Sequence, residues 1–375
     1  MCIAPNAQGR EYVHFEPAGK LPWRSHFSSL LLSADAVNTT LEVGFLLVLF
    51  AATVAFPGAL DTSGSMKLSQ LIAFLATCSV MRRVYNAYLE AVYFAFPARR
   101  IQPVAEHALR NNKDLNGRDR AQLRSLVYHD RMTLVTQLML VLILYFCVPG
   151  FYPADTSTRA YAPPYVRSLR LIAHHYLLSF GMYWAHRSLH VVPVLWTCIH
   201  SIHHWAKHPL SRNTYQDHWF DNFGNAIVGE VAAQILVPLD PLCFWFSRLF
   251  RIMESLEKHA GVSGVTNLAH SAQLWLPFAQ MPHHHDWHHE GHKSCNFTFA
   301  ALGGLWDCVF GTRKVGRAME QPTYATRADI QAEATKGAVT GWLLIRDDAL
   351  LVLSPVLAVL LAASFKLHAN GMRVA

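Results

Sequence analysis

Histidine is the residue type whose number and spacing stand out in this chain. The sequence contains 22 histidines, and most gather in two stretches, nine between His174 and His218 and seven between His270 and His292. Neutral imidazole is a ligand that suits iron, zinc, copper and nickel. Because these histidines are internal and bunched, they indicate metal binding rather than chance or a terminal tag.

Three clusters within these stretches have the spacing of one helical face. The first places two imidazoles four residues apart, and the other two follow the pattern His-x-x-His-His. Residues three or four apart lie on the same side of an α-helix, so each cluster presents its imidazoles together. Eight imidazoles on three helical faces could hold two metal ions. The predicted ligands are His186, His190, His200, His203, His204, His285, His288 and His289.

Other donor types are poorly represented. The sequence has no Cys-x-x-Cys pair, and its only Glu-x-x-His pair, Glu11 and His14, stands alone near the N-terminus. Soluble di-iron bundles use such carboxylate pairs, so the site predicted here is of a different type. Imidazole is neutral and leaves the charge of the metal uncompensated, which favours anionic partners between the ions.

The triplet before the third cluster has a predicted register. Pro282 suits the first position of a helix, because its missing N–H is not needed there. His283 is then rotated by about 200° from His285 and points away from the other imidazoles. His284 lies at the edge of the stripe, where it is either a ligand or a support for one.

The elements that must position these histidines read as membrane helices. Hydrophobic residues make up 52% of the chain and charged residues only 15%, a balance typical of polytopic membrane proteins. Apolar runs at 41–60, 68–96, 132–151 and 169–184 are long enough for spans. We therefore predict an all-α membrane bundle of about four spans with a histidine-rich helical cap. Residues 223–250 read as re-entrant or interfacial, and 350–365 as a possible fifth span.

Charge sets the predicted orientation and the divisions of the chain. The loop 98–131 carries eight of the Lys and Arg residues that give the chain its net charge of +7, which places it in the cytosol together with the histidine clusters. Residues 153–164 are then lumenal. We predict a polar segment at 1–40, three spans with the loop at 41–169, a catalytic domain at 170–315 and a C-terminal segment at 316–375.

The pattern resembles the fatty acid hydroxylase and sterol desaturase superfamily over about residues 170–312. The resemblance rests on Tyr-Trp-Ala-His-Arg at 183–187, on the three clusters in order, and on the closing segments 296–297 and 306–312. It is greatest to the sterol C4-methyl oxidase and C5-desaturase branch. Departures are Ser179, where the family often has an acid, and Trp219, where it has proline.

The resemblance also implies further site residues. A Tyr-x-x-His unit, Tyr215 with His218, and a His-Ser pair beginning at His270 match that branch. His218 and His270 are therefore expected as ligands. By the same resemblance Tyr215, Asn296 and Asp307 are expected to support the site.

The implied activity is that of a non-haem di-iron enzyme of the endoplasmic reticulum. Such an enzyme uses O2 and two electrons to hydroxylate or desaturate a lipid, sterol or terpenoid, and zinc may replace its iron on purification. The chain has no glycine-rich dinucleotide fingerprint, so a separate electron donor is expected. The resemblance implies cytochrome b5 or its reductase, docking near Arg99, Arg100, Arg110 and Lys113.

Two alternatives stay open at this point. A histidine-rich membrane metal transporter or metal-binding protein would use the same ligands without redox catalysis. His175 lies inside the fourth predicted span, about 16 Å along the helix from His186 and too far to share its metal. It either lines a substrate tunnel or forms a hydrogen bond between helices.

Overall fold

The structure is a computed structural model, and it is mostly helical. It describes residues 2–5, 11–14, 27–96, 99, 101, 117–154, 162–205, 209–215, 217–273, 278, 280–289, 294–298 and 304–313. Two short strands, β1 (Cys2–Pro5) and β2 (Glu11–His14), form an antiparallel pair in the segment that we predicted to be irregular. The described chain beyond them is helical, as the predicted all-α class requires.

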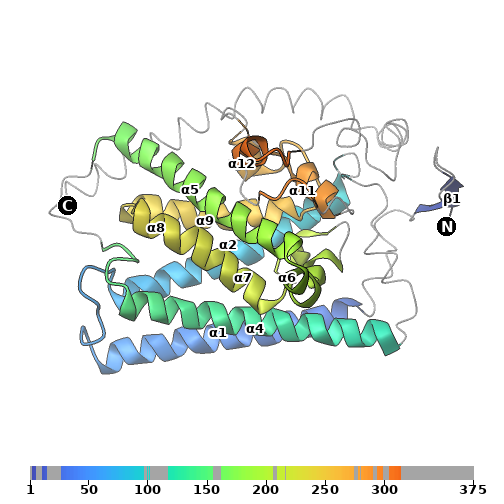
Figure 1. Ribbon diagram of the computed structural model, residues 1–375. Coiled ribbons are helices and arrows are strands. Elements are labelled where there is room, and N and C mark those ends of the chain that lie inside the picture. The colour runs from blue at the N-terminus through green and yellow to red at the C-terminus, as the bar shows by residue number, and fades with distance from the viewer. Residues whose placement is uncertain are drawn as a thin grey trace.

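Four long helices form the body of the molecule: α1 (Phe27–Ala55), α2 (Leu68–Ala95), α4 (Gly117–Cys147) and α5 (Pro164–Val191). Figure 1 shows α1 and α4 side by side along one face, with α11 and α12 on the side away from them. The remaining elements are α6 (Pro193–Cys198), η4 (His200–Trp205), η5 (Ser211–Asn213), α7 (Trp219–Asn225), the π-helix η6 (Ala226–Val231), α8 (Ala232–Leu236), α9 (Pro241–Lys258), α10 (Leu268–Ser271), α11 (Pro282–His289) and α12 (Gly304–Val309).

Two helices extend further than the apolar runs predicted. Helix α1 begins at Phe27, inside the predicted polar segment 1–40, and α4 begins at Gly117, inside the predicted loop 98–131. Hydropathy marks where a helix would enter a bilayer, not where its hydrogen bonding starts. Leu, Arg and Gln in 117–131 favour a helix whether or not they are in lipid.

Two helices are long and apolar enough to cross a membrane, over Ala36–Ala55 and Tyr128–Cys147. Only 11% and 28% of these windows are buried inside the molecule, and side chains such as Val48 and Val54 are exposed. The core helix of a soluble protein would bury such residues. The outward apolar faces therefore indicate association with a membrane, whereas the predicted total of about four spans stays a prediction.

The connections of the bundle fall at two opposite ends. At one end Met66 donates its N–H to Tyr152 O at 2.8 Å, and Arg167 at the start of α5 pairs with Asp240 at the start of α9. At the other end Ile101 N donates to Gly261 O at 2.9 Å, which joins the segment after α2 to the segment after α9. The histidine clusters lie at this second end.

Aromatic packing joins α2 to α9 between these ends. The ring centroids of Phe74 and Phe244 lie 5.5 Å apart, and both side chains are buried beside Tyr145 and Tyr152. Nearer the histidines, Leu89 of α2 packs with Leu256 of α9 in a second cluster. This packing fixes the face of α9 that reaches the site.

A close crossing holds α5 against the π-helix η6. A Cβ atom added to Gly181 would lie 2.0 Å from Val228 O, so the backbones meet where only glycine fits. Helix α5 ends at Val191 because Pro193 cannot continue it, and Pro193 instead occupies the first turn of α6. This break turns the chain, so that η4 faces the end of α5.

Residues 314–375 lie outside the described part of the chain, and so does the apolar stretch 350–365 that we predicted as a possible fifth span.

Candidate metal centre

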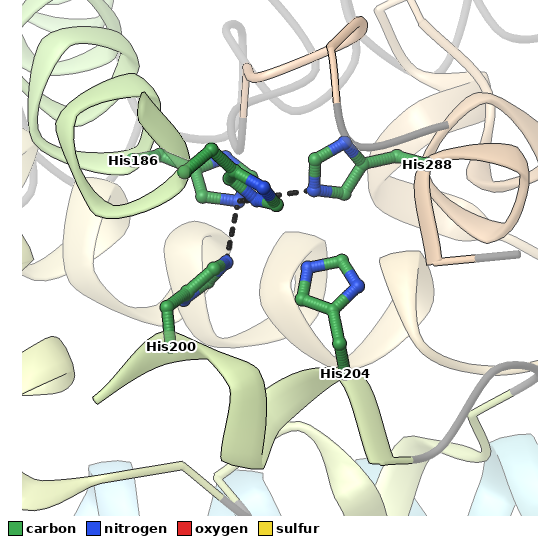
Figure 2. A group of neighbouring side chains, drawn as sticks. His186, His200, His204 and His288 are labelled. Atoms are coloured by element: carbon green, nitrogen blue, oxygen red, sulfur yellow. Dashed lines mark hydrogen bonds between the residues drawn. The ribbon is translucent and has the colours of Figure 1, made fainter. Parts of the chain in front are cut away.

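Nine buried or half-buried histidines form two adjacent groups at the second end of the bundle. Within each group the potential ligand atoms lie within 4.8 Å of one another. Figure 2 shows imidazoles of the first group converging from α5, η4 and α11. The first group is His186, His190, His200, His204 and His288, and the second is His203, His259, His285 and His289.

Each His-x-x-His-His triplet contributes two histidines to one group and one to the other. In η4 the pair four residues apart, His200 and His204, joins the first group, and His203 joins the second. In α11 the corresponding pair joins the second group, and His288 joins the first. The sequence predicted that the three imidazoles of each triplet lie on one stripe of a helix. Instead both short helices lie between the groups and contribute to both.

The spacing of ring nitrogens fits a bound ion. His186 Nε2 lies 3.0 Å from His200 Nε2, and His285 Nε2 lies 3.0 Å from His259 Nε2. Nitrogen atoms bound at right angles to one ion at about 2.1 Å would be about 3.0 Å apart. His204 is buried, and neither of its ring nitrogens has a hydrogen-bond partner among the described residues. Such a group needs a partner, and a metal ion would supply one.

The outer ring nitrogens are held by oxygen atoms. His186 Nδ1 donates to Phe297 O at 2.5 Å, His288 Nδ1 to Cys295 O at 2.7 Å, and His259 Nδ1 to Ser255 O at 3.0 Å. A carbonyl oxygen can only accept, so the proton lies on Nδ1 and the lone pair of Nε2 faces the group. This arrangement is typical of metal-ligating histidines.

Asp307 fixes the irregular segment 295–298, which carries two of those carbonyl groups. Its carboxylate accepts from Phe297 N at 2.9 Å and from Thr298 N at 3.1 Å, and it is fully buried. Asp307 therefore positions His186 and His288 through the backbone at 295–298. The resemblance implied a supporting role for Asp307, and the structure places it one step behind the ligands.

Asp221 is a supporting residue that the sequence analysis missed. Its carboxylate accepts from His200 Nδ1 at 2.5 Å and from Asn225 Nδ2 at 2.8 Å, and it is buried on α7. It lies in no recognisable motif, since the polar residues that follow His218 could equally have faced water.

Burial keeps the imidazoles neutral. Loss of water, followed by the proximity of other histidines, holds the pKa of His186, His204 and His285 well below the ordinary value. Burial lowers the pKa of His288 to about 3 and that of His259 to about 4. Neutral rings are the form that binds a metal.

His259 is the member of the second group that spacing did not reveal. It caps the end of α9 and lies 3.2 Å from His203 through their Nε2 atoms. No other histidine stands three or four residues away, so no cluster marks it. The indication available in the sequence was the mostly polar stretch 254–259, which ends a helix that begins with an apolar run.

Two predicted ligands are not brought into either group. His218 caps α7 through Phe220 N and packs its ring 4.4 Å from that of His129. His270 is fully buried, and its Nδ1 donates to Glu257 Oε2 at 2.5 Å. The second group instead takes His259.

The other tentative residues have separate places. His284 is buried against Met281 and stacks on His283, outside both groups. Asn296 donates to His284 O at 3.3 Å and has a positive φ of 54°, which turns the chain towards the carbonyls described above. Tyr215 lies beneath Arg82 in the wall of a cavity.

His175 forms a hydrogen bond between helices. Its Nε2 lies 3.1 Å from Ser247 Oγ of α9, and it does not line the cavity beside the histidine groups. Of the two alternatives left open by the sequence, the structure shows the interhelical contact.

Comparison with known proteins agrees with this geometry. Residues 171–312 match the family model described as fatty acid hydroxylase. Over this part of the chain the protein is similar to fatty acid hydroxylases. The match begins in α5 and ends after α12, so it contains all nine grouped histidines together with Asp221 and Asp307.

Curated relatives lie in the same superfamily. A putative methylsterol monooxygenase of Dictyostelium discoideum is 28% identical over 50% of this chain and 68% of its own length. A very-long-chain aldehyde decarbonylase of Oryza sativa subsp. japonica is 28% identical over 39% of this chain. Methylsterol monooxygenase 1-3 of Arabidopsis thaliana is 26% identical, also over 39%. The chain spans about half the length of these two plant relatives, 46% and 48%. No solved structure matches the chain significantly.

The family and these relatives indicate an enzyme of the oxygenase or hydroxylase class. Their names cover two different reactions, so membership does not define the substrate.

Proposed function

We propose that this protein is a membrane-bound non-haem di-iron oxygenase that hydroxylates an unactivated C–H position of a sterol, terpenoid or other lipid. The observation that carries the proposal is the pair of histidine groups, whose ligand atoms converge while the Nδ1 atoms of His186, His200, His259 and His288 are held from behind by oxygen atoms.

The donor sets favour iron over zinc. Zinc in structural sites takes four ligands in tetrahedral geometry. The first group offers five imidazoles, more than such a site uses, and the second offers four. Both sets would hold iron, which can change its oxidation state, whereas zinc cannot. When bound, the metal pair would supply the redox chemistry that attacks a C–H bond.

The residues of the chain would orient the metal ligands and exclude water from the metal centre. Asp221 and the carbonyls of Cys295 and Phe297 hold protons at Nδ1 and fix the angle of each ring. Trp196 packs on His190 at 5.0 Å between ring centroids and helps to exclude water. These contacts would hold the imidazole rings in fixed orientations around the metal ions, so that the metal centre keeps a fixed position relative to the substrate.

The lipid substrate is proposed from three supports. The relatives named methylsterol monooxygenases act on methylsterols, the outward faces of α1 and α4 indicate a membrane, and an elongated cavity reaches the second group. Hydroxylation is preferred, with desaturation as the variant outcome. Cytochrome b5 or its reductase remains the proposed donor. Arg99 is the one residue of its proposed docking region that the structure describes.

Expression in a sterol-making host tests the reaction. Lipid mass spectrometry should show a new species heavier by one oxygen atom, or lighter by two hydrogen atoms if the enzyme desaturates. Purified protein should hold about two metal ions per chain and consume O2 only when an electron donor is added. Two bound ions with metal flux across vesicles and no O2 consumption would support the transporter instead.

A further inference from the structure

A cavity of about 320 Å3 runs from the metal centre into the bundle. His203 and His259 of the second group lie in its wall, and Phe74, Leu134 and Leu144 line its apolar part. Ligand pockets usually measure about 300–1,000 Å3, so this one holds a single lipid chain or part of a larger ring system.

One helix carries a polar stripe along the cavity. Arg251, Ser255 and His259 follow one another at four-residue intervals on α9, and all three line the wall. Residues spaced in this way lie on neighbouring parts of one helical face. Arg251 and His259 are separated by about 12 Å along the helix axis, at about 1.5 Å per residue. The stripe therefore joins a metal ligand to a buried guanidinium.

Arg251 has an unused donor. It is 4% exposed, and its Nη1 donates to Glu254 Oε2 at 2.5 Å while Nη2 contacts Ser255 Oγ at 3.4 Å. Its Nε has no hydrogen-bond partner among the described residues. An unmatched N–H at such depth is costly, so it indicates a ligand oxygen that the cavity is built to receive.

The arginines in the cavity wall are paired with carboxylates. Arg248 pairs with Glu230 of the π-helix, and Arg82 pairs at 3.1 Å with Glu42, which also pairs with Arg83. Each arginine in the wall, Arg251 included, thus has a carboxylate partner. A ligand that carried its own carboxylate would have to compete with these partners in a poorly hydrated space.

The remaining carboxyl groups in the wall do not change this pairing. Asp221 is engaged with His200. Burial, together with the nearby Asp221, raises the pKa of Asp217 well above its ordinary value, which disfavours the charged form of that side chain. Among the described residues of the wall no arginine lacks a carboxylate partner, so the arginines do not favour an anionic ligand.

We propose that the cavity binds an uncharged lipid whose hydroxyl or carbonyl oxygen accepts a hydrogen bond from Arg251 Nε, with its apolar part directed to His203 and His259. Arg251 is then a positioning residue that places the oxygen of the ligand about 12 Å from the metal end of the stripe. This inference rests on the proposed function, because that function makes the bound lipid a substrate. Binding of the lipid can be measured without catalysis.

Photolabelling of the full chain in lipid nanodiscs tests the proposal. The probe is a long-chain primary alcohol with a diazirine in its chain, and the competitors are 1-dodecanol, dodecanoate and dodecane. We expect labelled peptides from α9 and the walls facing it. We also expect 1-dodecanol to compete about tenfold better than dodecane or dodecanoate, the effect of one hydrogen bond to a charged group.

Two variants isolate the Nε donor. Arg251→Lys keeps the charge that Glu254 needs but has no Nε–H. Arg251→Met combined with Glu254→Gln removes both charges, so neither is left buried alone. Both should lose the preference for the alcohol and retain metal. Arg170→Lys, at an exposed arginine of α5 outside the cavity, is the matched control and should behave as the wild type.

The outcomes separate this proposal from the proposed function. An unchanged alcohol preference in both folded, metal-loaded Arg251 variants would overturn the role of Arg251. Stronger competition by dodecanoate would overturn the uncharged ligand, and absence of label from the cavity walls would overturn the binding site. If the expected pattern appears in a protein that neither holds metal nor consumes O2, only the oxygenase proposal fails.

Discussion

His259 supplies a sharp test at the scale of single residues. It is one of four imidazoles in the second group, whereas the nearby His283 contacts Ser263 and belongs to neither group. We expect His259→Ala to retain about half of the bound metal and to lose activity, because the first group is intact. His283→Ala should keep the metal and most activity. Metal content by mass spectrometry on purified variants decides, and equal loss in the two variants would contradict this assignment.

Asp221 tests the outer support. Replacing Asp221 with Asn keeps the shape but removes the charge that orients the Nδ1 proton of His200. Changes of this kind lower metal affinity roughly 10- to 100-fold. Competition with a chelator of known affinity measures the change. Asn222→Ala, one residue on and bonded to Gln137 instead, should leave metal affinity unaltered.

The buried histidines also make stability depend on pH. An unfolded histidine takes up its proton near pH 6.5, whereas His259 and His288 do so near 4 and 3 in the folded, metal-free protein. Between these values the unfolded state binds more protons, so the free energy of unfolding falls as pH falls. Melting temperatures of the chelated protein should therefore drop from pH 6.5 to pH 4. A constant melting temperature over that range would show that the rings are not buried.

At the scale of elements, the crossing of α5 and η6 positions His186 and His190. Gly181→Ala would push a methyl group into Val228 O, with an expected loss of about 1–3 kcal/mol or more in the free energy of unfolding. Gly224→Ala is the matched control. A Cβ there meets nothing within 4 Å, so helix propensity should give a gain of about 0.5–1 kcal/mol. Thermal unfolding in detergent compares them, and equal effects would mean that the crossing is loose.

The sequence predicts those features of these elements that depend on neighbouring residues, and it does not predict those that depend on contacts between distant segments. The spacing of His285, His288 and His289 correctly predicts a helix that starts at Pro282, because periodicity and proline chemistry are local. The division of its imidazoles between two groups is set by which helices face α11. His259 and Asp221 escape prediction for the same reason, since their partners are remote in sequence. The start of α4 escapes because hydropathy does not register a charged helix.

At the scale of the whole molecule, two native cysteines test the orientation. Cys198 ends α6 beside the histidine groups, Cys147 ends α4 at the opposite end of the bundle, and both are exposed. In sealed microsomes with the cytosolic face outside, single-cysteine variants should differ. A membrane-impermeant maleimide should label Cys198 and spare Cys147 until detergent is added. The reverse order would invert the topology inferred from the positive residues.

The placement of α11 has a consequence for biosynthesis. Both groups include histidines of this helix, and the first of them stands at position 285, after every long helix that the structure describes. During membrane insertion the emerging chain therefore contains six of the nine grouped histidines. Neither group is complete at that stage. The packing of α2 on α9 and of α5 on η6 must suffice for that interval. Under the proposed function, metal delivery is then a final maturation step, and we expect iron-starved cells to accumulate inserted protein that lacks metal and activity.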